Sequence, residues 1–304
     1  MKVIAFDTSN YTTSCAVFDG KEGKNSSRLL DVKPGELGLR QSEALFSHIK
    51  RLPEIVSALD LSGEIAAVGT STKPRETEDS YMPCFLAGAS QAEVLSKALN
   101  VPLFAFSHQQ GHIAAAAWSA GRPDLLDTPH LAWHLSGGTT ELLYVVPSGC
   151  AVKCEIIGGT SDVSAGQLID RAGQLLGLRF PSGKALDALA ASSDGSDRYD
   201  MKLDGLKFSL SGAEHKMKQR FEQGASPESI ASFTLASVIS AVSRITKRAK
   251  EKYGDIPVLY SGGVASNTML RRLTPDGIFA EPQYSTDNAM GVAVLTHRAV
   301  NTIG

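Results

Sequence analysis

The chain lacks the features of a membrane, secreted or strongly basic protein. No apolar run approaches the roughly 20 residues that a membrane span requires. The segment from Lys2 to Asp7 is too short and too soon charged for a signal peptide. The formal net charge of −2 provides no global positive field that would attract nucleic acid. The four cysteines have no paired spacing, which predicts reduced thiols in a cytoplasmic protein.

Stretches typical of strands and of helices alternate along almost the whole chain, which predicts an α/β protein. The 304 residues are enough for two domains with full cores. A cluster of Gly, Pro and Asp near 121–129 suggests the boundary between them. We therefore expect an N-terminal lobe over 1–125 and a C-terminal lobe over 126–304, with a helical insertion near 162–225 and a last helix from about 286 to 302.

Two runs, 6–18 and 133–145, resemble one another. Each predicts a strand, a tight turn of small hydroxyl and glycine residues, and a second strand. Small residues let an anion approach turn amides and hydroxyls closely. A third glycine-rich run, 259–267, leads into a helix. Together they predict a nucleotide held in a cleft shared by two similar lobes, with these contacts: Asp7, Thr8, Ser9, Ser136, Gly137, Gly138, Gly262 and Gly263.

A histidine pair opens the alanine-rich helix expected from residue 108. His108 and His112 are four residues apart, so they share one helix face at the spacing that two imidazoles need to bind one metal ion. The alternative is a capped helix start with two partly exposed histidines. His130 and His134 are also four apart, but four residues of a strand span about 13 Å, so that pair cannot share an ion.

Two further side chains are candidate ligands. Asp287 is the most plausible third ligand, although Ser285 or Thr286 beside it can cap the last helix, where a helix N-terminus also favours anions. His134 can join the first pair from across the cleft, because it stands directly before the Ser-Gly-Gly turn. Imidazole and carboxylate ligands accept iron or zinc, so the choice of metal stays open.

Several motifs in a specific order resemble one known family. Beyond the Asp7-Thr-Ser run, the histidine pair and the Ser136-Gly-Gly-Thr-Thr turn, they are Gly159–Gly166, Ile169–Leu178, Pro181-Ser-Gly183, Phe208–Gly212, Gly262–Asn267 and Thr286–Ala289. The chain resembles the TsaD family, the tRNA N6-threonylcarbamoyladenosine synthases, which belong to the ASKHA superfamily of two actin-like, ribonuclease H-like domains. The resemblance runs from Ala5 to the last helix.

The resemblance implies an acyltransferase that moves a threonylcarbamoyl group from threonylcarbamoyl-AMP to N6 of the adenosine beside the tRNA anticodon. It implies iron or zinc on His108, His112 and Asp287, with His134 where some members use a tyrosine ligand. It also implies an adenylate or ATP in the cleft, a sister ASKHA subunit and an ATPase subunit. The phosphate loop corresponds to His134, Leu135, Ser136, Gly137 and Gly138, and the nucleoside contacts to Asp170, Gly183, Asp187 and Asn267. No side chain is assigned as a catalytic acid or base.

The chain also departs from the family pattern. Thr139 stands where the family usually has a histidine, and Lys73-Pro74-Arg75 stands within 70–79 where a Gly-Pro-Gly loop is usual. A small-molecule carbamoyltransferase, or a non-catalytic nucleotide-binding paralogue that acts through a sister subunit, therefore remains the alternative. A metalloprotease is disfavoured because Gln109 and Gln110 occupy the positions between the histidines, where a zincin helix has its glutamate base.

Basic runs offer only weak support for RNA contact. They lie at 215–220, 244–252 and 271–272. The second spreads round more than one helix face, so a solvated surface is at least as good an explanation.

Overall fold

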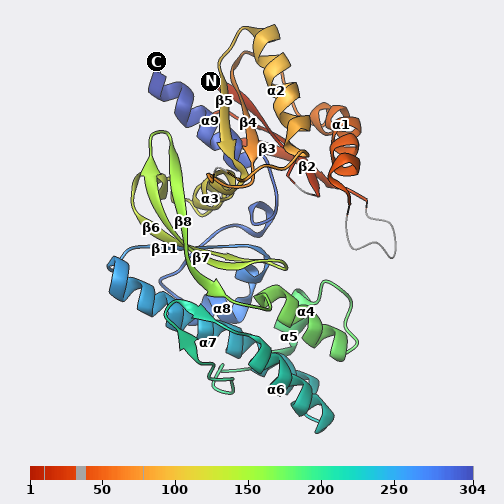
Figure 1. Cartoon of the computed structure of the whole chain (residues 1–304), viewed down its shortest axis with the longest axis vertical. Helices are drawn as coiled ribbons and strands as arrows, with labels where there is room; N and C mark the ends of the chain where they lie inside the picture. The colour runs from red at the N-terminus through yellow and green to blue at the C-terminus, as the bar shows by residue number, and fades with distance from the viewer. Residues whose placement is uncertain (10, 32–38, 78, 304) are drawn as a thin grey trace. The chain divides into compact units, whose positions relative to one another are not determined.

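A computed structural model of the chain describes residues 1–303 apart from 10, 32–38 and 78. It confirms the predicted α/β class and contains two separate sheets (Figure 1). Contacts divide the chain into two compact units. The first comprises 1–128, 146–154 and 284–304, and the second comprises 129–145 and 155–283.

The first unit is built on a five-stranded sheet in the order β3-β2-β1-β4-β5. Its strands are β1 (Lys2–Asp7), β2 (Thr12–Phe18), β3 (Gly23–Leu29), β4 (Ile65–Lys73) and β5 (Leu103–Ser107), and its helices are α1 (Gln41–Ser57), α2 (Phe85–Leu99), α3 (His108–Ser119), the short η1 (Pro123–Asp127) and α9 (Met290–Ile303). β1 is antiparallel to β2 and parallel to β4, and β4 is parallel to β5. The carboxyl ends of β1, β4 and β5 therefore meet at one edge.

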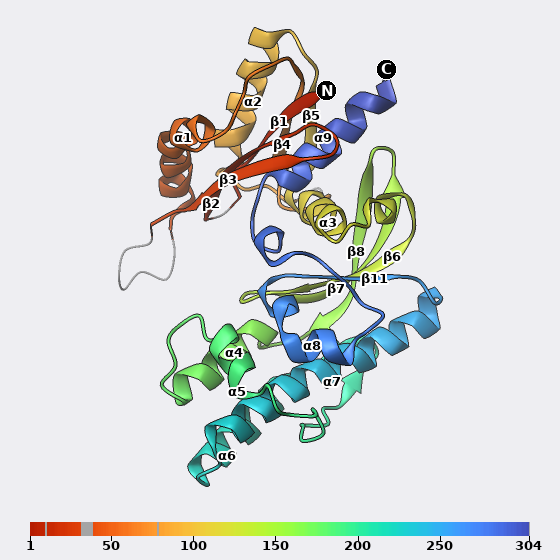
Figure 2. The ribbon, with the colours of Figure 1, turned by 180° about the vertical axis from the view of Figure 1, so that it is seen from behind.

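Helices cover both faces of this sheet, as Figures 1 and 2 show. A Cβ added at Gly88 of α2 would lie 3.3 Å from Phe6 Cβ, whereas one at Gly69 of β4 would lie 1.8 Å from Thr296 Oγ1 of α9. Side chains alternate between the faces of a strand. Ala5 and Asp7 therefore share the face that α9 covers.

The compact units divide the chain differently from the predicted lobes, 1–125 and 126–304. The last helix belongs to the first unit, where it packs against β1, β2, β4 and α3. Its Val292, Leu295 and Ala299 are buried. This tertiary contact joins segments far apart in the sequence, and no local pattern announces it.

The second unit carries the sheet β12-β11-β6-β7-β8-β10-β9. Its strands are β6 (His130–Leu135), β7 (Thr140–Ser148), β8 (Ala151–Thr160), β9 (Leu203–Asp204), β10 (Lys207–Phe208), β11 (Val258–Ser261) and β12 (Ile278–Phe279), and its helices are α4 (Ala165–Leu175), α5 (Gly183–Leu189), α6 (Ser211–Glu222), α7 (Pro227–Tyr253), the short η2 (Gly263–Ser266) and α8 (Thr268–Leu273), with η3 (Pro282–Tyr284) at the unit's end. The predicted break in the helical region at Pro181 separates α4 from α5. Both predicted hairpins form, as β1–β2 and as β6–β7.

Helix α7 corrects one expectation. By length and composition it could cross a membrane, although the sequence was expected to hold no such run. However, 67% of its most apolar window is buried inside the protein. Trp133 Nε1 of β6 also donates to Thr246 Oγ1 of α7 over 2.8 Å. These contacts are those of a core helix.

One carboxylate joins two loops of the second unit. Asp162 Oδ1 accepts from the backbone N–H groups of Val163 (2.7 Å) and Leu210 (2.9 Å), and Oδ2 accepts from the hydroxyls of Ser209 and Ser211 at the start of α6. Burial opposes its charge, but these hydrogen bonds hold the pKa of Asp162 well below its usual range. The ionised carboxylate therefore stabilises the fold.

We expect Asp162→Asn to lower the free energy of unfolding by about 1–2 kcal/mol at pH 7, because an amide replaces an acceptor of several hydrogen bonds. A lowered folded-state pKa means that the stabilisation is complete above the unfolded pKa of about 3.9 and is lost as the pH falls below it. Urea unfolding at a series of pH values from 7 to 3 measures both the free energy of unfolding and its dependence on pH. Asp204→Asn removes the same charge from an exposed position and is the matched control. Equal stability of the two variants at pH 7 would contradict the assignment.

Candidate functional site

The start of α3 places the two histidines. Ser107 and Gln110 form a capping box, in which Gln110 N donates to Ser107 Oγ (3.3 Å) and Ser107 N donates to Gln110 Oε1 (2.9 Å). The Gln110 amide also donates to Val152 O over 2.7 Å. The capped start and the histidine pair, which were alternative interpretations, thus occur together, and Gln110 has a structural role.

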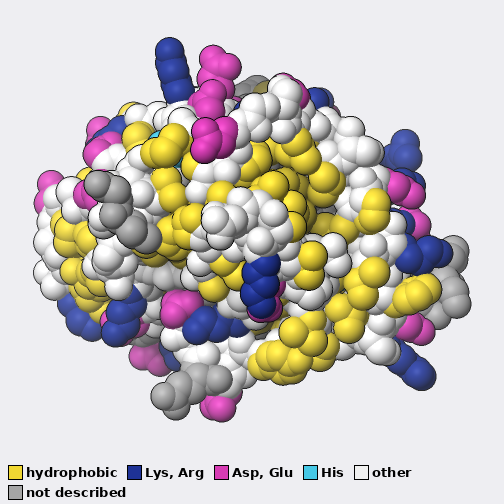
Figure 3. Space-filling view, turned by 90° about the horizontal axis from the view of Figure 1, so that it is seen from above, with side chains coloured by type: hydrophobic (Ala, Val, Ile, Leu, Met, Phe, Trp, Pro, Cys, Tyr) yellow, Lys and Arg dark blue, Asp and Glu magenta, His cyan; other side chains and the backbone are white. Residues whose placement is uncertain are grey.

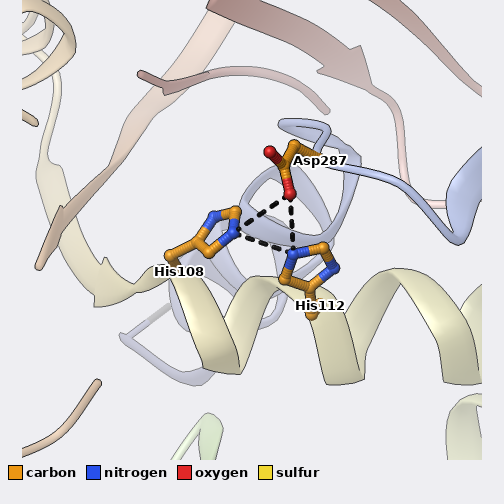
Figure 4. A group of neighbouring side chains, drawn as sticks. All are labelled: His108, His112 and Asp287. Carbon is orange, nitrogen blue, oxygen red and sulfur yellow. Dashed lines mark hydrogen bonds and ion pairs between the residues drawn. The ribbon is translucent and has the colours of Figure 1, made fainter. Parts of the chain in front are cut away.

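His108, His112 and Asp287 converge, as Figure 4 shows. The two Nε2 atoms lie 2.8 Å apart, and Asp287 Oδ1 lies 3.5 Å from that of His108 and 3.3 Å from that of His112. These residues all belong to the first unit. The predicted ligand trio is therefore brought together within a single compact unit.

A backbone contact makes this convergence possible. A Cβ added at Gly291 of α9 would lie 1.7 Å from Gly111 O of α3, so the two helices approach with no room for a side chain between them. Gly111 lies next to His112, and Gly291 is the second residue of α9, the helix that follows Asp287. The close approach therefore brings the Asp287 loop to the histidines.

Asp287 does not belong to a helix, which corrects one prediction. The last helix was expected from about 286 with Ser285 or Thr286 as its cap, but α9 begins at Met290. Asn288 Oδ1 accepts from Met290 N (3.0 Å), and its amide donates to Thr286 O (2.6 Å). Asn288 thus stabilises a local turn just before α9, and the Asp287 carboxylate faces the histidines.

Asp7 supports the cluster from the sheet. Its Oδ2 lies 2.8 Å from His108 Nδ1, and its Oδ1 accepts from Ser9 N over 3.0 Å. The residue is 1% exposed. A buried carboxylate on the outer nitrogen of a histidine fixes the ring and directs its other nitrogen towards a ligand. Asp7 was predicted as a nucleotide contact, but both of its oxygens are engaged here.

Two carboxylates determine the charge state of His108. Burial opposes the charged imidazole, but the Asp7 and Asp287 carboxylates raise the pKa of His108 to about 10. Burial also opposes the charge of Asp287, yet hydrogen bonds and charge from the histidines hold the pKa of this carboxyl well below its usual range. The two carboxylates therefore favour the protonated form of His108.

One contributor was missed by sequence reasoning. Thr12 Oγ1 donates to Asp287 Oδ2 over 3.3 Å. The available signal was the alternation of β2, because Thr12 and Ser14 share a strand face and Ser14 Oγ donates to Asp7 O (2.9 Å).

The first hairpin turn uses its hydroxyls in different ways. Thr8 Oγ1 donates to Cys84 O (2.9 Å) and accepts from Gly88 N (3.1 Å), so it fastens α2 to the sheet. Ser9 Oγ is buried and has no hydrogen-bond partner among the described residues. The predicted anion contact of these two residues stays a prediction.

The second hairpin turn is braced by α4. Ser136 N donates to Thr139 O (2.8 Å), and Thr139 N donates to Ser136 Oγ (3.0 Å). Ser164 Oγ donates to Gly137 O (2.6 Å), while a Cβ at Gly166 would lie 2.5 Å from Gly137 Cα. A Cβ at Gly138 would meet nothing within 4 Å. The turn is thus rigid on one side and open at Gly138.

A hollow of about 690 Å³ lies beside this turn, and its lining includes Gly137, Asp170, Gln174, Phe180 and Ser182. Asp170 Oδ1 accepts from Ser182 N over 2.8 Å. Gly183 follows as the first residue of α5. Two of the predicted contacts, Gly137 and Asp170, therefore line one concave surface.

Asp187 and Asn267 are bonded to each other. Asn267 Nδ2 donates to Asp187 Oδ1 (2.7 Å), and Asn267 Oδ1 caps α8 by accepting from Leu270 N (2.9 Å). Gly262, at φ +91°, leads from β11 towards this region and passes so close to Leu135 that a Cβ would lie 2.2 Å from Leu135 O. Gly263 begins η2.

His134 lies in the second unit, on β6. Its Nδ1 is 3.4 Å from Ser261 Oγ of the neighbouring strand β11. Its role as a ligand stays a prediction.

The Lys-Pro-Arg segment is an ordered extension of β4. Pro74 O accepts from Gln109 N in the first turn of α3 (3.0 Å), and Lys73 Nζ lies 3.3 Å from Glu76 Oε2. Position 78 of this loop lies outside the described residues. The unusual segment is therefore fastened directly beside the histidine-bearing helix.

Each of the two units has a helix-covered sheet, which agrees with the two actin-like domains that the family resemblance implied. A solved structure of full-length HypF has a TM-score of 0.64 over 99% of this chain and 56% of that one, at 14% identity, so the likeness is one of fold.

The model of the TsaD family, tRNA N6-adenosine threonylcarbamoyltransferase, matches residues 81–294, and the chain belongs to this family of transferases. The protein of that name from Halalkalibacterium halodurans is 31% identical over 92% of this chain and 83% of its own length. The one from Enterococcus faecalis is 37% identical over 61% of this chain and 54% of its own length.

We expect Asn267→Ala to weaken adenylate binding and to leave metal content unchanged, because Asn267 lies in the unit that does not hold the His-His-Asp cluster. Loss of the cap should also cost about 1 kcal/mol of stability. Isothermal titration with AMP and elemental analysis measure the two properties. Asn267→Ser keeps a capping oxygen and separates stability from binding. An unaltered affinity in both variants would remove Asn267 from the site.

Proposed function

We propose that this protein transfers a threonylcarbamoyl group from threonylcarbamoyl-AMP to N6 of the adenosine beside the tRNA anticodon. Family membership supports the reaction, and the His108–His112–Asp287 cluster is the observation that carries the chemistry. Cytoplasmic tRNA is the expected acceptor. In the transfer, N6 forms a bond to the carbamoyl carbon and gives up a proton, while the bond to the phosphate oxygen breaks and AMP leaves.

The cluster fits a divalent transition metal. Ligands at about 2.0–2.1 Å around one ion lie roughly 3.3 Å from one another in a tetrahedral set. The two separations that involve Asp287, 3.3 and 3.5 Å, are close to that value, whereas the two Nε2 atoms lie closer together, at 2.8 Å. His108, His112 and Asp287 would hold iron or zinc, with His134 as a proposed additional ligand. Such an ion supplies Lewis-acid polarisation of the carbonyl and charge for the leaving phosphate.

The protein's own groups orient these partners. Asp7 holds the His108 ring so that Nε2, rather than Nδ1, faces Asp287. The Ser136–Gly138 turn offers backbone donors suited to an anion, and Asp170 offers a carboxylate to ribose hydroxyls in the hollow of the second unit. A proton on His108 would leave when a metal ion binds.

An exposed apolar surface supports a protein partner. Helices α1 and α2 pack together, and they expose Phe46, Ile49, Leu86 and Val94, which supports an apolar contact with a sister ASKHA subunit. An ATPase subunit is proposed from the family resemblance alone.

The face that Figure 3 shows carries no distinct basic patch for tRNA among the described residues. In Figure 3, Lys and Arg side chains are scattered rather than gathered. In the predicted basic runs, Arg220 pairs with Asp197, Lys218 with Glu214, and Arg271 donates to Ala280 O. These cations serve the fold.

The alternative is a carbamoyltransferase of small molecules or a paralogue that binds nucleotide without transfer. The charged Lys73-Pro74-Arg75 segment beside α3 is the observation that favours it. An acceptor that enters there would meet side chains where the family usually has glycines.

Transfer of labelled threonine to unmodified tRNA distinguishes these functions. We expect the protein, added to a threonylcarbamoyl-adenylate generator and the usual partner subunits, to label tRNA. His108→Ala combined with His112→Ala should abolish both transfer and metal content. It should also lower the melting temperature, because the buried Asp7 loses its partner, while a cooperative unfolding transition shows that the variant is still folded. Retained metal in the double variant would contradict the site, and absent transfer by a metal-loaded wild-type protein would favour the alternative.

A further inference from the structure

Thr12 lies against Asp287 at the start of β2. Its N–H donates to Ser9 O over 3.0 Å, which closes the hairpin turn, and the residue pairs with Leu29 of β3. It is 6% exposed. The turn and the sheet therefore fix the backbone of Thr12 independently of its contact with Asp287.

The Asp287 carboxylate is divided between two environments. Oδ1 faces the Nε2 atoms of His108 and His112, whereas Oδ2 accepts from Thr12 Oγ1 over 3.3 Å. A carboxylate can bind a metal through one oxygen or through both. A hydrogen bond to Oδ2 favours binding through Oδ1 alone.

The backbone around Asp287 does not by itself fix this orientation. Asp287 lies in the irregular segment between η3 and α9. Two strands hold the segment from the side: Asn25 Oδ1 of β3 accepts from Ala289 N (3.0 Å), and Thr12 of β2 contacts the carboxylate. The Thr12 hydroxyl holds Oδ2 from the sheet side, while the two histidines face Oδ1.

We propose that Thr12 is a positioning residue that keeps Asp287 as a one-oxygen metal ligand, so that a coordination position remains for the substrate carbonyl or phosphate. The proposal rests on the metal site proposed above, but not on tRNA as the acceptor. Without the hydroxyl, the carboxylate turns and presents both oxygens, which fills the position that the substrate would take.

The test uses the full-length protein and compares Thr12→Val, which is nearly isosteric, with Thr12→Ser, which keeps the hydroxyl. Zinc affinity is measured by chelator competition, and coordination by the visible spectrum of the cobalt(II)-loaded protein with and without added inorganic phosphate. We expect Thr12→Val to lower zinc affinity by about 10-fold, in the range seen when the outer partners of metal ligands are removed. Its cobalt spectrum should alter and lose its response to phosphate, whereas Thr12→Ser should match the wild type.

Thr13→Val is the matched control. Thr13 is also buried, but its hydroxyl pairs with His48 Nδ1 (2.8 Å) on the other face of β2. The Thr13→Val variant should be less stable than the wild type but should keep its zinc affinity and its cobalt spectrum. Should Thr12→Val not fold, Thr12→Ala takes its place in the same assays.

Unchanged zinc affinity and an unchanged cobalt spectrum in the folded Thr12 variants would overturn the proposal, and so would a wild-type protein that binds neither metal. A Thr12-dependent metal site in a protein that labels no tRNA would instead refute the proposed function and leave the role of Thr12 intact.

Discussion

The close approach of α3 and α9 at Gly111 and Gly291 is the constraint on which the His-His-Asp cluster depends. Two helices normally pack at interaxial distances set by the side chains between them. Here that layer is missing at one point, since Gly111 O lies where a Cβ of Gly291 would be. The residues just before α9 are thereby brought within hydrogen-bonding range of residues at the start of α3.

The polar groups of the two units are stabilised by different interactions. In the first unit, opposite charges are paired: the buried Asp7 and the partly exposed Asp287 flank His108, and each carboxylate oxygen has a partner. An unpaired charge at the depth of Asp7 would cost several kcal/mol. In the second unit, the Ser136 turn and the Asp187–Asn267 pair are held by neutral or charge-assisted hydrogen bonds, and Gly137 and Asp170 line an open hollow. The first arrangement suits an ion, and the second suits a polar organic ligand.

Local sequence patterns predicted the fold class, both hairpins and the start of α3. These features depend on strand alternation, capping and i,i+4 spacing, which are properties of short segments. The sequence alone did not predict that α9 belongs to the first unit or that it begins at Met290. Both depend on tertiary contacts, with β1 and β4 for the helix and with Asn288 for its first turn. Asp7 was expected at a nucleotide because its turn looked suitable for an anion, and its bond to His108 required the fold. The family resemblance supplied Asp170, Asp187 and Asn267, which spacing alone would not have selected.

The assignment of α9 to the first unit has a consequence for biosynthesis. Residues 155–283 are made before this helix, so most of the second unit's sequence is available to fold while the first still lacks part of its core. Until α9 docks, one face of β1 and β4 remains exposed and the buried carboxylate of Asp7 has only part of its final surroundings. The unit that the ribosome begins first is therefore the one that is completed last, and its apolar sheet face is the surface on which a chaperone would act in the interval.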